Sequence, residues 1–259
     1  MRIVRYLPSS GKNILWGWVS EGKVGSLDGD PFGAFKRKKT YVSLERVKLY
    51  PPVVPGKIVC VGRNYVAHAE EHDAEVPEIP LIFLKPPSSI IADGERILIP
   101  PQSERVEHEA ELAVVIGLGG RWIKRADAHK HVLGYTIAND VTARDLQRGD
   151  GQWTRGKGFD TFCPLGPWIE TELDPSDLII KCSVNDQLRQ LGSTLDMVFP
   201  VATLVAYVSS VMTLNPGDVI LTGTPSGVGP LTDGDEVEVE IEGIGTLHNH
   251  VRRDQRSAG

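Results

Sequence analysis

The chain has 259 residues, of which 41% are hydrophobic and 24% are charged, as is typical of a folded globular protein. The net charge of −6 argues against nucleic acid as the main partner, because phosphate binding needs an excess of Lys and Arg. No stretch approaches about 18 uninterrupted apolar residues, and the N-terminus lacks the apolar run of a signal peptide. We therefore expect a cytoplasmic protein with no membrane partner. Cys60, Cys163 and Cys182 are too few and too widely spaced for a disulfide framework or a zinc site, so we expect buried thiols.

Residues 1–54 are predicted to form a small N-terminal β domain. Two strand-like runs, residues 2–6 and 14–19, are separated by a turn of Pro, Ser, Gly and Asn. The proline-rich residues 51–56 are typical of a semi-rigid linker. We therefore place a domain boundary there, with a second and larger domain at residues 55–259.

The second domain is predicted to begin with a short buried strand, residues 57–61, and a helix at residues 66–72. His68 and Glu71 are three positions apart, so they share one face of that helix and are able to pair. An ordinary surface pair is the alternative explanation. The proline-flanked, charged residues 76–80 are more typical of a mobile lid than of a core element.

Residues 107–116 carry carboxylates into an apolar strand. Because side chains alternate along a strand, Glu109 and Glu111 project from the same face, roughly 6.5–7 Å apart at the backbone. Two buried carboxylates repel each other, and a divalent cation would remove this penalty. The alternative is a solvated face, which we expect for the alternating acidic residues 236–242. The residues alone leave both explanations open.

Two further strand ends carry polar side chains. The predicted strand 133–138 leads to Asp140, which either presents a ligand or caps a following helix. Lys85 ends the predicted strand 81–84, where its ammonium reaches either water or an anionic ligand. The glycine-rich residues 148–160 are predicted to form a functional loop.

Helical structure is also expected at residues 121–131 and 200–212, and the second of these helices is amphipathic. Its apolar stripe is predicted to face the core and consists of Leu204, Val205, Val208, Val211 and Met212.

Six short motifs follow one another along the second domain. They are Gly62-Arg63-Asn64-Tyr65, Phe83-Leu84-Lys85-Pro86, His108-Glu109-Ala110-Glu111-Leu112, Asn139-Asp140-Val141-Thr142-Ala143-Arg144-Asp145, Lys157-Gly158-Phe159-Asp160 and Thr222-Gly223-Thr224-Pro225-Ser226-Gly227-Val228-Gly229. Each motif is weak alone, but six in this order are specific. Over residues 57–250 the chain resembles the fumarylacetoacetate hydrolase family, especially its single-chain bacterial branch. The N-terminal unit resembles the small β domain that precedes this core in 2-hydroxyhepta-2,4-diene-1,7-dioate isomerases.

The resemblance implies a mainly β fold with some α-helix, a mixed β roll of the fumarylacetoacetate hydrolase C-terminal type, preceded by the small β domain. It implies one bound Mg²⁺ or Mn²⁺ and a homodimer. The implied metal ligands are Glu109, Glu111 and Asp140. The implied catalytic residues are Lys157 beside the metal and the His68–Glu71 pair, which orients and deprotonates water in family hydrolases. The implied substrate contacts are Arg63, Tyr65, Lys85, Arg144, Gln152 and Thr224, the last in a loop whose backbone N–H groups can hold a carboxylate.

The implied function is that of a divalent-metal-dependent enzyme acting on a 2-oxo, enolisable dicarboxylic acid through a metal-stabilised enolate. Reprotonation of the enolate gives isomerisation, and its formation by loss of CO₂ gives decarboxylation. Activation of water by His68 and Glu71 would give hydrolysis of a C–C bond instead. We favour the isomerase or decarboxylase type, in the catabolism of aromatic compounds. An acylpyruvate hydrolase and an oxaloacetate decarboxylase are the alternatives.

Two hypotheses belong to other classes. A catalytically idle, metal-binding structural subunit is one, although retention of Lys157, His68 and Glu71 argues against it. Without the resemblance, a carbohydrate-binding β protein would be the next candidate.

Overall fold

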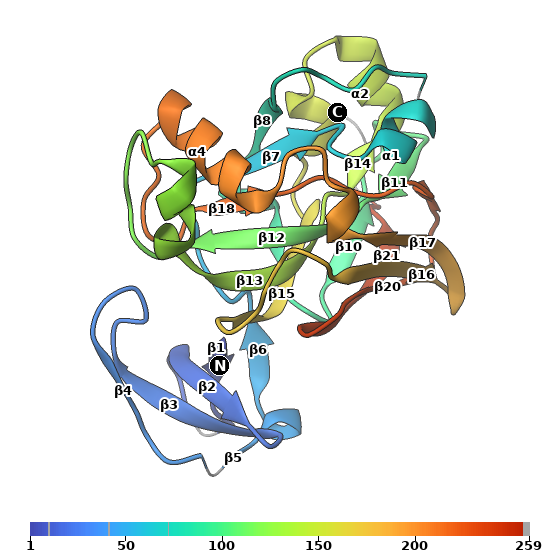
Figure 1. Cartoon of the computed structure of the whole chain (residues 1–259). Helices are drawn as coiled ribbons and strands as arrows, with labels where there is room; N and C mark the ends of the chain where they lie inside the picture. Colours follow the sequence, from blue (N-terminus) through green and yellow to red (C-terminus); the bar gives the residue numbers. More distant parts are fainter. Residues whose placement is uncertain (10, 41, 72, 256–259) are drawn as a thin grey trace.

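The computed structural model describes residues 1–9, 11–40, 42–71 and 73–255. A small N-terminal β unit, blue in Figure 1, lies below a larger body that holds all four α-helices. The strands of the small unit are β1 (Arg2–Leu7), β2 (Leu15–Ser20), β3 (Lys23–Gly29), β4 (Phe35–Arg37), β5 (Val42–Ser43) and β6 (Lys48–Tyr50), with a 3-10 helix at Leu44–Arg46. The predicted small β domain is thus confirmed, whereas its boundary at residues 54 and 55 stays a prediction.

The larger body contains fifteen of the described strands, the four described α-helices and three 3-10 helices. Its strands are β7 (Ile58–Gly62), β8 (Leu81–Lys85), β9 (Ile90–Ile91), β10 (Arg96–Ile99), β11 (Val106–His108), β12 (Ala110–Ile116), β13 (Val132–Asn139), β14 (Thr142–Ala143), β15 (Cys163–Glu170), β16 (Ile179–Val184), β17 (Gln187–Ser193), β18 (Val219–Leu221), β19 (Gly229–Leu231), β20 (Glu236–Ile241) and β21 (Gly245–Arg253). Its α-helices are α1 (Val66–Glu71), α2 (Arg144–Asp150), α3 (Thr154–Lys157) and α4 (Val201–Val211). Three 3-10 helices lie at Pro87–Ser89, Arg125–His131 and Thr194–Asp196.

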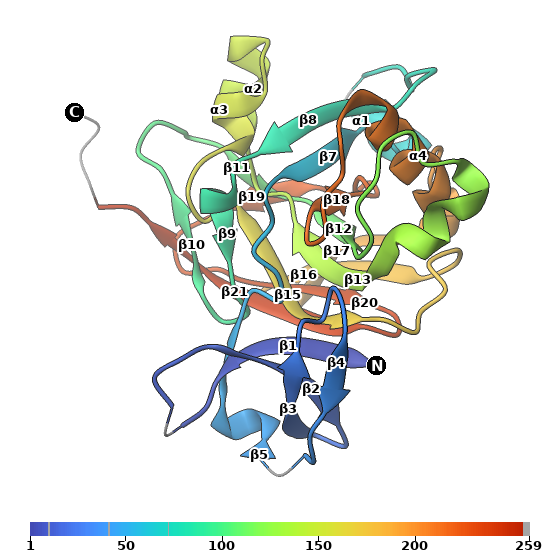
Figure 2. The same ribbon diagram turned by 90° about the vertical axis from the view of Figure 1, so that its left-hand side faces the viewer.

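One large mixed sheet runs through both parts, in the order β4-β3-β2-β1-β15-β13-β12-β18-β7-β8. The two parts meet where β1 pairs antiparallel with β15, and Figure 2 shows this junction from the side. A second sheet has the order β10-β21-β20-β16-β17, and a third has the order β14-β11-β19. The predicted fold class, mainly β with some α-helix, is therefore confirmed.

Strand β12 lies at the centre of the large sheet, between β13 and β18, and all its residues are buried. Its side chains alternate between two hydrophobic clusters. Val114 and Ile116 belong to one cluster, whereas Ala113 and Val115 belong to the other. Each such aliphatic side chain stabilises the fold by about 1.5–3 kcal/mol when it is fully buried. This packing fixes the strand that carries Glu111.

Several local predictions need correction. The acidic strand is interrupted at Glu109, because the chain leaves β11 in the third sheet and enters β12 in the large sheet there. The helix-cap alternative for Asp140 is wrong, since Ala143 is the residue that precedes α2. Only Arg125–His131 of the predicted helix 121–131 is helical, and it is a 3-10 helix. Val211 is 50% exposed, so it does not belong to the core stripe of α4.

Other local predictions are confirmed. The acidic strand at residues 236–241 is β20, which buries Val237 and Val239 and directs its glutamates outward. Cys60, Cys163 and Cys182 are buried free thiols. The helix predicted at residues 66–72 is α1, although His72 lies outside the described residues. Within the described part of the chain, no helix is long and apolar enough to span a membrane.

Candidate metal centre and active site

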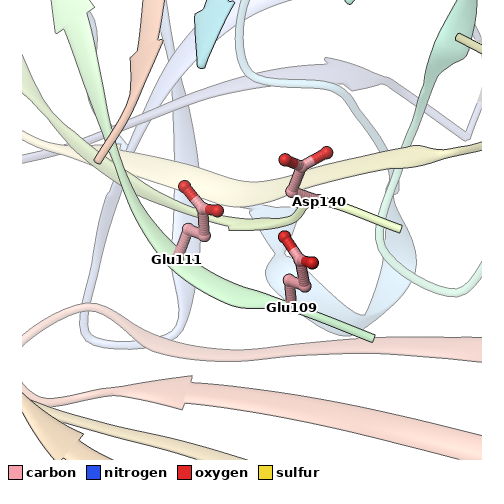
Figure 3. A group of neighbouring side chains, drawn as sticks. All are labelled: Glu109, Glu111 and Asp140. Carbon is pink, nitrogen blue, oxygen red and sulfur yellow. The ribbon is translucent and has the colours of Figure 1, made fainter. Parts of the chain in front are cut away.

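Three carboxylates from two neighbouring strands meet at one point. Ala110 pairs with Asn139 across β12 and β13, so the first residues beyond these strand ends, Glu109 and Asp140, lie side by side. Glu111 projects from the second position of β12. Potential ligand atoms of the three side chains lie within 4.8 Å of one another. Figure 3 shows these carboxylates gathered around a common space.

Three buried cations surround two of these carboxylates. The Lys157 Nζ lies 2.7 Å from Glu109 Oε2 and 2.7 Å from Asp140 Oδ2. Lys85 Nζ donates to Asp140 Oδ1 at 2.6 Å, and Arg144 Nη2 donates to Glu109 Oε1. Burial alone would raise the pKa of Glu109, but Lys157 and Arg144 outweigh it and hold this pKa well below its usual range. Glu109 is therefore a stable anion.

Glu111 is different, because no cation of a described residue forms an ion pair with it. It is 2% exposed, and its Oε2 accepts a hydrogen bond of 2.6 Å from the backbone N–H of Gly223. Burial, together with the negative charges of Asp140 and Glu109, raises the pKa of Glu111 well above its usual range. A hard divalent cation would favour the ionised form and would take oxygen ligands from all three residues. The donor set therefore fits Mg²⁺ or Mn²⁺.

The carboxylates open into a cavity of about 300 Å³. Eight of the predicted site residues line it: Arg63, His68, Glu109, Glu111, Asp140, Arg144, Lys157 and Thr224. Phe83 and Trp153, which contact each other edge to face with ring centroids 5.1 Å apart, form an apolar part of the wall. The cavity therefore combines a strongly charged floor with an apolar side.

The comparisons with known proteins agree with this architecture. Residues 57–252 match the family described as Fumarylacetoacetate (FAA) hydrolase C-terminal, and residues 1–52 match the family Rv2993c-like, N-terminal. The chain belongs to the fumarylacetoacetate hydrolase family. Members of this family are enzymes and typically depend on a divalent metal ion.

Three relatives in the fumarylacetoacetate hydrolase family have informative names. A human protein, Oxaloacetate tautomerase FAHD2A, mitochondrial, is 50% identical over 215 residues, which cover 78% of this chain and 68% of the relative. The crystal structure of 2-hydroxyhepta-2,4-diene-1,7-dioate isomerase from Mycobacterium marinum has a TM-score of 0.91 at 42% identity, over 99% of this chain and 100% of that one. A 5-carboxymethyl-2-hydroxymuconate delta-isomerase from Mycobacterium smegmatis has a TM-score of 0.90 at 45% identity, over 98% and 100% of the two chains.

The family's His–Glu pair lies at the edge of this cavity, on α1. His68 Nδ1 is 3.4 Å from Glu71 Oε2, and the His68 ring lines the cavity. The backbone N–H of Gly227 donates to both oxygens of Glu71, at 3.1 and 3.2 Å. Burial lowers the pKa of His68, although the carboxylates of Glu109 and Glu71 partly oppose this. The imidazole is therefore neutral near pH 7 and able to accept a proton.

Three of the predicted substrate contacts lie outside the residues that line the cavity. Lys85 is fully buried behind Asp140, and Tyr65 is 2% exposed with its hydroxyl buried. Gln152 is exposed beyond the end of α2. Their roles in substrate binding stay predictions.

Gln147 lines the cavity and was missed from the sequence. Arg144, Gln147 and Arg148 are three and four positions apart on α2, so they share one face of the helix. Arg144 Nη1 donates to Gln147 Oε1 at 2.6 Å. The helical spacing was the available signal, but the many glycines and polar residues after Arg148 indicated a loop.

The hydroxyl of Thr224 is engaged within the protein. It donates to the carbonyl of Ala110 at 2.8 Å and accepts from Gln190 Nε2 at 2.7 Å. Gln190 is fully buried, donates also to the carbonyl of Pro225 at 2.8 Å, and accepts from the N–H of Ala110 at 3.1 Å. Gln190 thus fixes the glycine loop to the start of β12, although nothing in the sequence pattern indicated it.

Replacing Gln190 with Met should raise KM for a carboxylate substrate about tenfold, because the loop loses two hydrogen bonds. Steady-state kinetics at saturating metal ion would measure this change. Thr224→Ser keeps the hydroxyl and serves as the control with nearly unchanged KM. An unchanged KM in Gln190→Met would show that the loop is positioned without this amide.

Proposed function

We propose that this chain is a divalent-metal-dependent enzyme that enolises a 2-oxo dicarboxylic acid, of the isomerase or decarboxylase type. The observation that carries the proposal is the meeting of Glu109, Glu111 and Asp140 within 4.8 Å, in a cavity that Lys157 also lines. Such a site combines ligands for a hard cation with a cationic proton carrier. This combination suits chemistry that develops negative charge on an oxygen beside a carboxylate.

The reaction needs a developing enolate oxygen to be stabilised. Glu109, Glu111 and Asp140 would hold a divalent cation, and that cation would supply Lewis-acid stabilisation of this oxygen. The ammonium of Lys157 adds positive charge at the same place. In the metal-free protein, burial alone would lower the pKa of Lys157, but Asp140 and Glu109 raise it, so its side chain is protonated there. A protonated Lys157 can donate a proton to the carbon of an enolate whose hydroxyl proton has passed to solvent, and the neutral amine then takes up a proton from solvent.

The glycine loop is suited to hold the carboxylate of the substrate. Gly223 donates its backbone N–H to Glu111, so this part of the loop lies against the charged floor. Because the hydroxyl of Thr224 is engaged inward, we assign the contact with substrate to backbone N–H groups of the loop.

The names of the relatives support proton transfer at an enol or 2-oxo acid. The Mycobacterium marinum and Mycobacterium smegmatis structures are of isomerases, and the human relative is an oxaloacetate tautomerase. All three reactions move a proton between carbon and oxygen or between two carbons. Decarboxylation of oxaloacetate would use the same stabilised enolate.

Hydrolysis of an acylpyruvate is the second candidate, and the His68–Glu71 pair favours it. The neutral imidazole of His68 faces the cavity and can deprotonate water, while Glu71 orients the ring. Hydrolysis requires this pair, whereas reprotonation of an enolate by Lys157 does not.

The decisive assay offers three substrates to the protein after removal of metal ions: oxaloacetate, an acylpyruvate and 2-hydroxyhepta-2,4-diene-1,7-dioate. We expect turnover of the dienedioate and enolisation of oxaloacetate only after addition of Mg²⁺ or Mn²⁺. Glu109→Gln should abolish turnover, whereas Glu240→Gln, on the exposed face of β20, should keep it. His68→Gln separates the two candidates, because it should stop hydrolysis and spare isomerisation.

Tight binding of metal with no turnover of any of the three substrates would contradict the proposal and favour the idle subunit. Predominant metal-dependent cleavage of the acylpyruvate, lost in His68→Gln, would favour the hydrolase instead. Cytoplasmic location, a homodimer and a role in the catabolism of aromatic compounds stay parts of the proposal. Gel filtration and subcellular fractionation test the first two.

A further inference from the structure

Two arginines of the cavity differ from its other cations. Arg63 and Arg148 both line the cavity and are exposed. Neither forms an ion pair or a side-chain hydrogen bond with any described residue. Lys157 and Arg144, in contrast, are almost fully buried and bound to carboxylates. The outer part of the cavity therefore presents positive charge that the protein itself does not neutralise.

Arg63 is held in place at a conformational cost. Its φ of 57° lies in the left-handed region, which favours Gly or Asn over Arg. The neighbouring Asn64 is fully buried and fixes the turn, because its Nδ2 donates to the carbonyls of Thr222 and Phe199 at 2.7 and 3.1 Å. A rigid turn thus places a guanidinium at the cavity although another residue would fit the backbone better.

Arg148 lies one helical turn beyond Arg144 on α2. The acidic residues of this helix are engaged elsewhere. Asp150 accepts hydrogen bonds from Arg155, one of them from Nε at 2.7 Å, and Asp145 accepts from Ser103 at 2.6 Å. The helix therefore leaves Arg148 without an internal carboxylate partner.

We propose that Arg63 and Arg148 form the subsite for the second carboxylate of the substrate and select dicarboxylic over monocarboxylic 2-oxo acids. This inference rests on the proposed function, which places the 2-oxo acid end at the charged floor. The cations at the floor are already paired with its carboxylates, whereas the two arginines of the outer part are not, so a second carboxylate of the substrate is favoured at the outer part of the cavity. A guanidinium can bind a carboxylate through two parallel hydrogen bonds, which suits two arginines for this role.

Binding measurements test the subsite without any need for turnover. Isothermal titration of the protein in Mg²⁺ would compare 2-oxohexanedioate with 2-oxohexanoate, which has the same length but lacks the second carboxylate. Matched pairs with four, five and seven carbons would find the preferred length. In the wild type we expect the dicarboxylate to bind about a hundredfold more tightly at that length.

Two single variants should each reduce this preference about tenfold, since each removes one charged donor. Arg63→Asn suits the left-handed backbone and so removes the charge without strain, and Arg148→Gln keeps a good helix former. The double variant should lose the preference, and affinity for the monocarboxylate should stay within about twofold. Arg125→Gln, an exposed arginine outside the cavity, is the control with wild-type preference.

The subsite would be refuted by equal binding of dicarboxylates and monocarboxylates at every length. Equal weakening of both ligands in the variants would also refute it, because that indicates a general effect of charge or folding. An arginine-dependent preference in a protein that turns over no 2-oxo acid would support the subsite and contradict the proposed function. The two proposals can therefore fail separately.

Discussion

Replacement of Lys157 by Met is expected to lower kcat about a thousandfold and, at the same time, to raise the affinity for Mg²⁺ or Mn²⁺ about tenfold. The two effects have one origin. The Lys157 Nζ lies 2.7 Å from oxygens of both Glu109 and Asp140, so it adds positive charge beside two of the proposed metal ligands. Its removal deletes the proton donor but also the charge that opposes a divalent cation. A metal titration and steady-state kinetics at saturating metal would measure the two effects.

Lys85→Met provides the matched comparison, because Lys85 also contacts Asp140 and is also buried. Lys85 is buried behind Asp140 and does not line the cavity, so we expect it to exchange no proton with the substrate. With saturating metal ion, this variant should keep kcat within about tenfold of the wild type. Equal losses of kcat in both variants would mean that Lys157 acts only through its charge on Asp140.

Glu111→Gln and Glu109→Gln are expected to change the stability of the metal-free protein in opposite directions. Glu109 is bound to Lys157 and Arg144, so its neutralisation leaves two buried cations short of a partner and should cost about 3–5 kcal/mol. Glu111 has no such cation and is repelled by its neighbours. Its neutralisation should stabilise the metal-free protein by about 1 kcal/mol, since the amide oxygen can still accept from Gly223.

Both variants should bind Mg²⁺ or Mn²⁺ about a thousandfold more weakly and lose turnover, because each removes one of three charged ligands. Urea unfolding without metal, and again with added Mn²⁺, would measure stability and its increase on metal binding. A fall in the stability of metal-free Glu111→Gln would show that this carboxylate is satisfied without a cation, and would count against the metal centre.

The proximity of the three proposed metal ligands could be predicted from the sequence, because it depends on spacing along one strand and on the pairing of neighbouring strands. Glu109 immediately precedes β12, Glu111 is the second residue of β12, and Asp140 immediately follows β13. The antiparallel pairing of β12 with β13 brings these positions together. The structure supports this proximity even though Glu109 lies between two strands rather than within one.

The places of the other residues at the site depend on tertiary packing, which the sequence pattern does not reveal. The family resemblance implied Gln152 as a substrate contact, whereas the residue of this region that lines the cavity in the fold is Gln147 of the short helix α2. Gln190 comes from a strand of the second sheet and reaches the glycine loop only in the folded molecule. Lys85 ends its strand as expected, and its ammonium donates a hydrogen bond to Asp140 rather than reaching solvent. No local pattern encodes such long-range contacts.

The contact between Glu71 and Gly227 links two parts of the cavity wall. It holds α1, and with it His68, against the loop that also binds Glu111 through Gly223. A hydrogen bond to a charged group is worth about 1.5 kcal/mol, so its loss would weaken the attachment of α1 to this loop about tenfold. The position of His68 at the cavity thus depends in part on Gly227, a residue that does not line it.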